Sequence, residues 1–223
     1  MYVLYGGKFT RAVMVEMVLA EIGVPFELRE VDTGCGEHRS EEFLKINPAG
    51  WVPALITPEG DALYETPAIN LYLAERHAAE HLIPLSKDPA RGRFLSAYFY
   101  LSGELEPAMK RYFFPHRYGD GEAGAPIVKA KAFEAARTCL KVIERRLSTE
   151  GPYHLEQRFS LADLVLAHWV ATFEEQDVIS DLPAVSGCVA LVVERPRLAP
   201  VFEKQAAWMK ELFELYGEGG GVR

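Results

Sequence analysis

The most informative segment of the sequence joins a polar turn to an apolar, strand-like run, and it reads Asn47-Pro48-Ala49-Gly50-Trp51-Val52-Pro53-Ala54-Leu55. Pro53 stands where a strand should begin, so one hydrogen-bond donor of that strand is missing. An X-Pro bond needs only about 0.5–1 kcal/mol to become cis. A cis bond would turn the Val52 backbone N–H and C=O toward a peptide-like ligand, whereas a trans bond would make Pro53 an ordinary strand start. The local sequence leaves both forms open.

The residues around this segment predict a small α/β unit. Strand-helix-strand order at the start of the chain indicates two parallel strands joined by a right-handed crossover. Thr10 is expected to cap the first helix, and Gly23 to end it. The predicted elements are, in chain order, a strand at 2–5, a helix at 10–22, a strand at 26–32, a helix at 40–46, strands at 53–57 and 62–64, and a helix at 67–76.

The pattern changes after residue 85, because from residue 88 onward apolar residues recur at helical spacing to the end of the chain. Pro107 is expected to kink or split the first of these helices, and Gly217–Arg223 to fray. We therefore expect an α/β domain at 1–79 and an all-α domain at 88–216. The predicted helices are 88–114, 127–149, 160–175, 184–194 and 196–215.

Charge and cysteine content exclude several classes of protein. The 24 Lys and Arg against 32 Asp and Glu give a net charge of −8. Binding to nucleic acid or to an anionic membrane needs a concentrated basic face, so neither is expected. The three cysteines, Cys35, Cys139 and Cys188, are odd in number and widely spaced. Such spacing suits reduced thiols, and a cytoplasmic location is expected.

Two further motifs complete the pattern. A second segment reads Tyr64-Glu65-Thr66-Pro67-Ala68-Ile69-Asn70-Leu71-Tyr72-Leu73, and a third reads Phe159-Ser160-Leu161-Ala162-Asp163-Leu164. Ser160 and Asp163 have the spacing of a capping box, with Phe159 and Leu164 as its hydrophobic staple. The order of all three segments over the whole chain resembles the cytosolic glutathione transferases. This resemblance implies a thioredoxin-like N-terminal domain and an all-α C-terminal helical bundle.

The resemblance also implies a glutathione site, with glutathione as co-substrate. In the family, the residue before a cis-proline pairs its backbone with the glutathione cysteine, which places Val52 and Pro53 in the site. Glu65 and Thr66 would hold the γ-glutamyl end. Thr66 stands at a helix N-terminus, where free N–H groups favour a carboxylate.

The other end of the tripeptide is implied by a second match. His38-Arg39-Ser40 resembles the theta-like branch of the family, in which a histidine at that offset contacts the glycine end. Trp51 occupies a position where relatives often carry Lys, Arg or Gln. The glycine carboxylate is therefore expected to have fewer charged partners in this chain.

The family activates the thiol with a Tyr, Ser or Cys near the first strand–helix turn, and here Thr10 and, second, Tyr5 are the candidates. Lys8 or Arg11 could instead stabilise the thiolate by charge. A free thiol titrates near about 8.5, so lowering its pKa by about 2 units takes roughly 2.7 kcal/mol. One hydroxyl donating to a charged sulfur contributes about 1.5–3 kcal/mol. A single well-placed hydroxyl can therefore suffice.

We expect the chain to conjugate glutathione to a small apolar electrophile in detoxification, as a homodimer. Alternatives are a glutathione-dependent isomerase or dehalogenase on the same fold, or a non-catalytic binding protein. The electrophile pocket is expected to contain Tyr112, Phe113, His116 and Trp208. No metal is expected, although His77-Ala78-Ala79-Glu80-His81 matches a zinc-binding spacing, because no third ligand is identifiable in the sequence.

Overall fold

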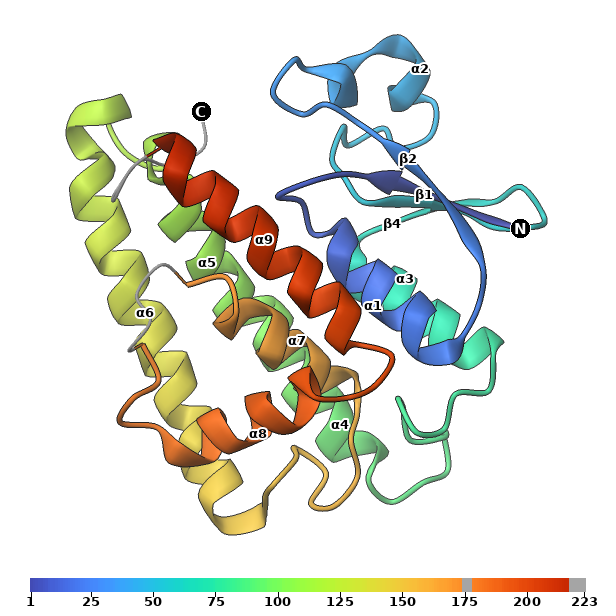
Figure 1. The fold of residues 1–223 in the computed structure, drawn as a ribbon, viewed down its shortest axis with the longest axis vertical. Helices are drawn as coiled ribbons and strands as arrows, with labels where there is room; N and C mark the ends of the chain where they lie inside the picture. The colour runs from blue at the N-terminus through green and yellow to red at the C-terminus, as the bar shows by residue number, and fades with distance from the viewer. Residues whose placement is uncertain (174–177, 217–223) are drawn as a thin grey trace. The chain divides into compact units, whose positions relative to one another are not determined.

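A computed structural model describes residues 1–173 and 178–216 (Figure 1). The chain divides into two compact units, one formed by Met1–Ile83 with Arg195–Met209, the other by Pro84–Glu194 with the residues from Lys210 onward. The end of the predicted helix 160–175 and the predicted frayed segment 217–223 lie outside the described residues. The domain limits 1–79 and 88–216 stay a prediction.

The first unit is built on a mixed four-stranded sheet with the order β2-β1-β3-β4. Strand β1 (Tyr2–Gly6) pairs in parallel with β2 (Phe26–Glu30), which confirms the predicted crossover. It also pairs antiparallel with β3 (Ala54–Ile56), and β3 pairs antiparallel with β4 (Ala62–Tyr64). The observed strands lie within or one residue beyond the predicted ranges.

Helices cover both faces of this sheet. Helices α1 (Ala12–Ile22) and α3 (Thr66–Arg76) contact each other on one face, and the short helix α2 (Glu41–Leu44) lies on the other, as Figure 1 shows. Gly23 ends α1 with a left-handed φ of 71°, as predicted. The predicted Thr10 cap is confirmed in part: the N-cap position is Arg11, one residue later than expected, but the Thr10 hydroxyl accepts from the N–H of Ala12, the first residue of α1, at 3.3 Å.

A distant segment, Arg195–Met209, belongs to the first unit through contacts with α1. It includes the first half of α9 (Ala199–Tyr216). Arg195 pairs with the buried carboxylate of Glu21, and Arg197 donates to the Glu21 carbonyl oxygen at 2.6 Å. Lys204 pairs with Glu16. Because the dipole of a helix favours cations at its C-terminal end, the two contacts of Arg195 and Arg197 with Glu21 stabilise the end of α1.

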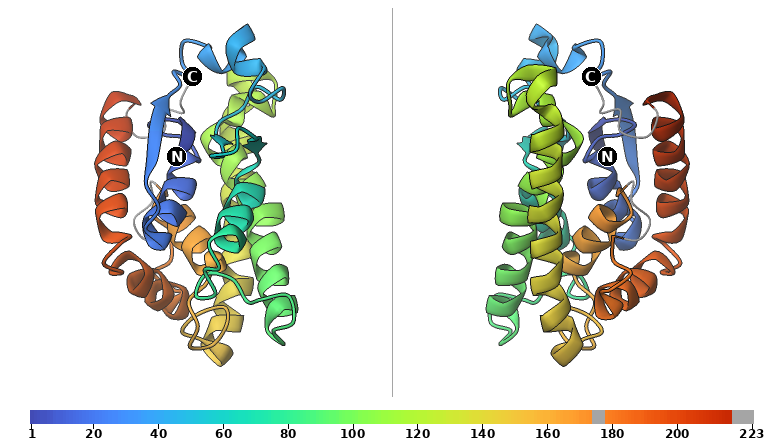
Figure 2. Two further views of the ribbon diagram at one scale, coloured as in Figure 1. Left: turned by 90° about the vertical axis from the view of Figure 1, so that its right-hand side faces the viewer. Right: turned by 90° about the vertical axis from the view of Figure 1, so that its left-hand side faces the viewer.

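The second unit is helical. Its helices are α4 (Arg91–Tyr100), a π-helical turn η2 (Leu101–Leu105), α5 (Glu106–Phe113), the short η3 (Pro115–Arg117), α6 (Gly121–Glu150), α7 (Leu161–Val170) and α8 (Pro183–Val193). Figure 2 shows α6 running along this unit, in contact with α5 and α8.

The predictions that concern two prolines had opposite outcomes. The predicted interruption near Pro107 is confirmed, because the helix widens into η2 just before it. Pro107 has no N–H to donate to the preceding turn, and a π-helical turn accommodates that loss. The predicted start of the next helix at 127 is wrong, since α6 begins at Gly121 and contains Pro126.

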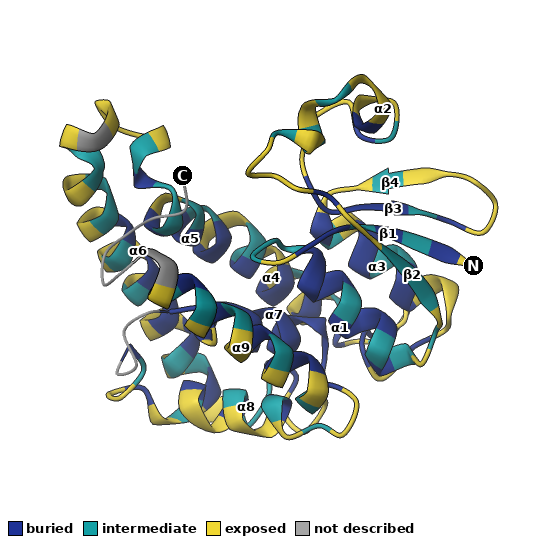
Figure 3. Cartoon of the chain, turned by 45° about the horizontal axis from the view of Figure 1, so that its top comes forward, coloured by how far each residue is buried: buried dark blue, intermediate teal, exposed yellow. Residues whose placement is uncertain are grey.

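Helix α7 forms the core of the second unit, since all ten of its residues are buried (Figure 3). The predicted capping box at its start is confirmed. The Asp163 carboxylate accepts from the Ser160 N–H and hydroxyl at 2.8 Å each, and from the His154 N–H at 2.8 Å. No helix in the described part of the chain is both long enough and apolar enough to cross a membrane.

Candidate functional site

The register of the sheet brings three loops to one edge. Tyr5 pairs with Ala54, and Ala54 pairs with Tyr64, so the end of β1, the start of β3 and the end of β4 lie side by side. The residues beyond this row are Gly7–Thr10, Val52–Pro53 and Glu65–Thr66. The predicted catalytic and peptide-binding positions therefore lie at the same edge of the sheet.

The Val52–Pro53 peptide bond is cis, as the family resemblance implies. The Val52 side chain is buried in a small apolar cluster with Val31, Phe43 and Ala54. Within residues 1–173 and 178–216, no group forms a hydrogen bond with the Val52 N–H or C=O. Both backbone groups are therefore available to pair with the main chain of a peptide ligand.

The start of α3 combines a strained residue with an unused buried hydroxyl. Glu65, at the N-cap position, has φ 69° and ψ 111°, and its side chain is exposed. Left-handed φ values in non-glycine residues cluster at functional sites. Thr66 is 2% exposed, and its hydroxyl has no hydrogen-bond partner among the described residues. A buried hydroxyl beside free helix N–H groups is suited to an anionic ligand.

Thr10 lies in the turn between β1 and α1. Its hydroxyl donates to the Gly7 carbonyl at 2.8 Å and accepts from the N–H groups of Gly7 and Ala12 at 3.3 Å each. The turn is tight, because a Cβ atom at Gly6 would lie 2.1 Å from that of Ala12. Phe9, the preceding residue, has a left-handed φ of 60°. The Thr10 proton is thus engaged with a carbonyl group in the unliganded protein.

Tyr5, the second candidate for thiol activation, lies on the α2 face of the sheet. Its ring packs edge-on against Phe43, with the centroids 6.1 Å apart. Its hydroxyl accepts a hydrogen bond from Arg29 at 2.9 Å. Because the hydroxyl accepts in this pair, its own proton remains available for donation.

The loop after β2 contains a cation that the sequence analysis did not assign to the site. The Arg39 guanidinium lies over the Trp51 ring, 4.6 Å from its centroid, and donates to the Ala49 carbonyl at 3.2 Å. Gly50 permits this approach, since a Cβ atom there would lie 2.8 Å from the Arg39 Nη1. His38 lies on the same ring, with centroids 6.2 Å apart. The feature of the sequence that could have pointed to Arg39 is its place directly after His38, which was assigned to the site.

Cys35, in the same loop, is exposed but is not an activated thiol. The Asp32 carboxylate accepts a hydrogen bond from the Cys35 N–H at 2.9 Å. Hydrogen bonding and charge repulsion from Asp32 raise the pKa of the Cys35 thiol above its usual value. A nucleophilic cysteine needs the opposite shift, so Cys35 is not a candidate nucleophile.

The four residues predicted for the electrophile pocket fall in both units. Tyr112, Phe113 and His116 lie in the second unit, at the end of α5 and in η3. Tyr112 is buried, and Phe113 and His116 are half-buried. Trp208 lies on α9 in the first unit, with the Lys204 ammonium 5.0 Å from its ring centroid. A pocket that contains all four residues stays a prediction.

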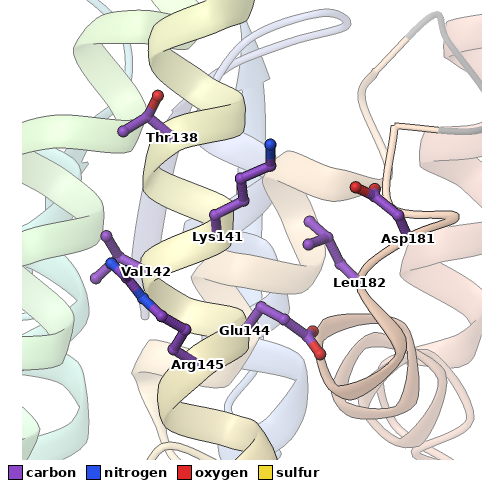
Figure 4. Close-up of a pocket in the computed structure, with 7 residues that line it drawn as sticks. All are labelled: Thr138, Lys141, Val142, Glu144, Arg145, Asp181 and Leu182. Atoms are coloured by element: carbon purple, nitrogen blue, oxygen red, sulfur yellow. The ribbon is translucent and has the colours of Figure 1, made fainter.

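A surface pocket lies beside α6 (Figure 4), and its charged side chains hold α6 to the segment that leads into α8. The Glu144 carboxylate accepts from the N–H groups of Ala184 and Val185 at 3.1 and 2.8 Å, at the start of α8. Asp181 pairs with Arg137 at 2.8 Å. The lining residues are Thr138, Lys141, Val142, Glu144, Arg145, Asp181 and Leu182.

The two histidines at zinc-binding spacing contact other groups. The Nε2 atom of His77 lies 3.0 Å from the Tyr2 hydroxyl, and that of His81 lies 3.9 Å from Glu21. Across residues 1–173 and 178–216, no group of three or more His, Cys, Asp or Glu side chains is placed to hold a metal ion.

Comparison with known families fits this geometry. Residues 11–76 match the glutathione S-transferase N-terminal domain, and residues 109–205 match the glutathione S-transferase C-terminal domain. The chain belongs to the glutathione S-transferase family. It is 32% identical over 212 residues to glutathione S-transferase 3 of Zea mays, and this match covers 92% of this chain and 88% of that protein.

Solved structures share the fold over nearly the whole chain. A glutathione transferase homolog from Sulfitobacter, solved with bound glutathione, is 28% identical with a TM-score of 0.80, and the match covers 92% of this chain and 98% of that one. Glutathione transferase F7 from Populus trichocarpa is 26% identical with a TM-score of 0.80, over 92% of this chain and 99% of that one.

Proposed function

We propose that this protein binds glutathione at the edge of the sheet and transfers its sulfur to an electrophilic carbon. The observation that carries this proposal is the Thr66 hydroxyl at the start of α3, which is buried and has no hydrogen-bond partner among residues 1–173 and 178–216. A hydroxyl in that position costs free energy in the unliganded protein and gains a partner when an anion binds.

The γ-glutamyl end of glutathione carries a carboxylate and an ammonium group. The carboxylate accepts from the Thr66 hydroxyl and the first N–H groups of α3, where the helix dipole also favours negative charge. The exposed Glu65 carboxylate pairs with the neighbouring ammonium. The free N–H and C=O of Val52 pair with the main chain of the glutathione cysteine, beside Pro53.

The glycine end lies against His38, Arg39 and Trp51. Trp51 carries no charge, but the Arg39 guanidinium stacked on it supplies one. Stacking on an aromatic face leaves the in-plane N–H groups of a guanidinium free to pair with a carboxylate. Arg39 therefore provides the cation that relatives often carry at the position of Trp51.

The reaction is a nucleophilic substitution or addition by sulfur. The thiol loses its proton to solvent, and the thiolate attacks the electrophilic carbon to form a C–S bond. In a substitution the leaving group departs with the electron pair of its bond to that carbon. In an addition the π bond breaks, and the neighbouring atom takes its electron pair and then a proton from solvent. Thr10 orients or activates the sulfur, for which its hydroxyl must turn from the Gly7 carbonyl. Such a hydrogen bond stabilises the thiolate by about 1.5–3 kcal/mol.

We also propose that the chain acts as a cytoplasmic homodimer in detoxification, and the family relationship supports this.

The engaged Thr10 proton favours a second candidate function, a protein that binds glutathione without catalysing conjugation. The two are separated by assaying turnover of 1-chloro-2,4-dinitrobenzene in the wild type and in Thr10→Val and Tyr5→Phe. Transferase activity predicts turnover that one of these substitutions lowers while glutathione affinity stays within a few-fold. Saturable glutathione binding with no turnover above the uncatalysed rate would establish the binding protein instead.

A further inference from the structure

Helix α3 buries the side-chain amide of Asn70. This residue is 0% exposed, and neither its Oδ1 nor its Nδ2 atom has a hydrogen-bond partner among residues 1–173 and 178–216. A side-chain amide offers one acceptor oxygen and two N–H donors. Burying such a group without hydrogen bonds costs free energy, so its presence in a folded protein calls for an explanation.

Asn70 shares one face of α3 with Thr66. The two residues are four positions apart, so their Cβ atoms lie about 5–6 Å apart on neighbouring turns of the helix. Side chains in a helix lean toward its N-terminus, which brings the Asn70 amide toward Thr66. The Thr66 hydroxyl is also buried and also lacks a partner in the described part of the chain. Helix α3 therefore buries three neighbouring polar atoms that the described residues leave without hydrogen bonds.

Packing of α3 does not explain an asparagine at this position. The other buried residues of the helix beyond Thr66 are apolar, namely Ile69, Leu73 and Ala74, and each is 0% exposed. An apolar residue at position 70 would match these neighbours and would remove the cost of the unpaired amide. Residues that lower stability in this way are expected at functional sites. Thr66, one turn away, is the first residue of α3 and lies at the edge of the sheet where we place glutathione.

We infer that Asn70 is a positioning residue for the γ-glutamyl carboxylate of glutathione and acts through Thr66. When the carboxylate binds, the Thr66 hydroxyl donates its proton to a carboxylate oxygen. The hydroxyl oxygen then accepts an N–H of the Asn70 amide, since a hydroxyl can donate and accept at the same time. Linked hydrogen bonds of this kind polarise and strengthen one another. The inference rests on the proposed function, because Asn70 acts on the ligand only through Thr66.

A double-mutant cycle separates this role from a purely structural one. Calorimetric titration with reduced glutathione would give dissociation constants for the wild type, Asn70→Leu, Thr66→Val and the double variant. Leucine has nearly the branched shape of asparagine and no polar atom. We expect Asn70→Leu to raise the dissociation constant roughly 2- to 10-fold, the range of one hydrogen bond between neutral groups. In the Thr66→Val background the same substitution should have no effect, because the hydroxyl through which Asn70 acts is gone.

Three controls make the cycle specific. Ile69→Val removes a methylene group from the same buried part of α3 and no polar atom, so it should lower the melting temperature and leave glutathione affinity unchanged. If leucine does not fit at position 70, Asn70→Ala gives the same comparison with a smaller side chain. The third control is a ligand, 4-aminobutyryl-cysteinylglycine, which is glutathione without the γ-glutamyl carboxylate. Its affinity should be the same for the wild type and Asn70→Leu.

The outcomes distinguish this inference from the proposed function. A loss of affinity that Asn70→Leu causes equally with Thr66 and with valine at that position would overturn the inference, because Asn70 would then act independently of the hydroxyl. Wild-type affinity in Asn70→Leu would overturn it as well, and so would an equal loss for the analogue without the carboxylate. In these cases the wild type still binds glutathione and the proposed function stands. Failure of the wild type to bind glutathione would overturn both.

Discussion

The substitution Thr66→Val tests the candidate site because it should change stability and binding in opposite directions. The Thr66 side chain is 2% exposed and its hydroxyl has no partner in the described part of the chain. Burying a hydroxyl without a hydrogen bond costs about 1–3 kcal/mol. Valine has nearly the same shape and no polar atom, so Thr66→Val should raise the free energy of unfolding by up to that amount. The melting temperature should rise by about 2–10 °C.

The same substitution should weaken glutathione binding. A hydrogen bond from the hydroxyl to the γ-glutamyl carboxylate involves a charged acceptor and contributes about 1.5–3 kcal/mol. Each 1.4 kcal/mol is tenfold in affinity, so the dissociation constant should rise roughly 10- to 150-fold. Isothermal titration calorimetry gives the dissociation constant, and urea unfolding without glutathione gives the stability.

Thr66→Ser is the matched control, because it keeps the hydroxyl and removes one methyl group. Its affinity for glutathione should stay within a few-fold of the wild type, and its stability should fall by about 1 kcal/mol. A Thr66→Val protein that is less stable and binds glutathione normally would refute the reasoning. In that case the hydroxyl would have a partner inside the protein and no role in binding.

Three further expectations concern the same edge of the sheet. Glu65→Ala should weaken glutathione binding at least tenfold by calorimetry, since the ammonium group loses its carboxylate partner, and unchanged affinity would remove Glu65 from the site. Thr10→Ala should lower kcat for 1-chloro-2,4-dinitrobenzene more than it changes glutathione affinity, and unaltered turnover would place the activating group elsewhere. Asp32 raises the pKa of the Cys35 thiol, so alkylation of Cys35 by iodoacetamide should increase with pH through a midpoint above that of a free thiol, about 8.5. Asp32→Asn should move this midpoint down, and a midpoint that does not move would contradict the assigned cause.

Most of the fold could be predicted from local patterns. Alternating apolar residues defined the strands, and Gly23 ended α1 as expected because few other residues adopt its left-handed conformation. The wrong predictions concern helix boundaries, whose exact positions depend on contacts in the folded chain. The N-cap position of α1 lies one residue later than the sequence predicts, and the Thr10 hydroxyl both accepts from the Ala12 N–H and donates to the Gly7 carbonyl across the turn.

The candidate site was predictable only in part. The positions of Val52, Glu65 and Thr66 came from the resemblance to a family, and the sheet register then brought them to one edge. The left-handed φ of Glu65 had no signal in the sequence. Arg39 was missed because its place over Trp51 depends on the close approach that Gly50 permits. Such an approach is a property of the folded loop and not of local propensity.

Calorimetric titration of the purified protein with reduced glutathione at neutral pH tests the central claim most directly. The account predicts saturable binding of one glutathione per chain, together with a rise in melting temperature when glutathione is in excess, because a ligand that binds only the folded state stabilises it. No detectable heat and no thermal shift at millimolar glutathione would contradict it, and the glutathione site proposed at Val52, Glu65 and Thr66 would have to be abandoned.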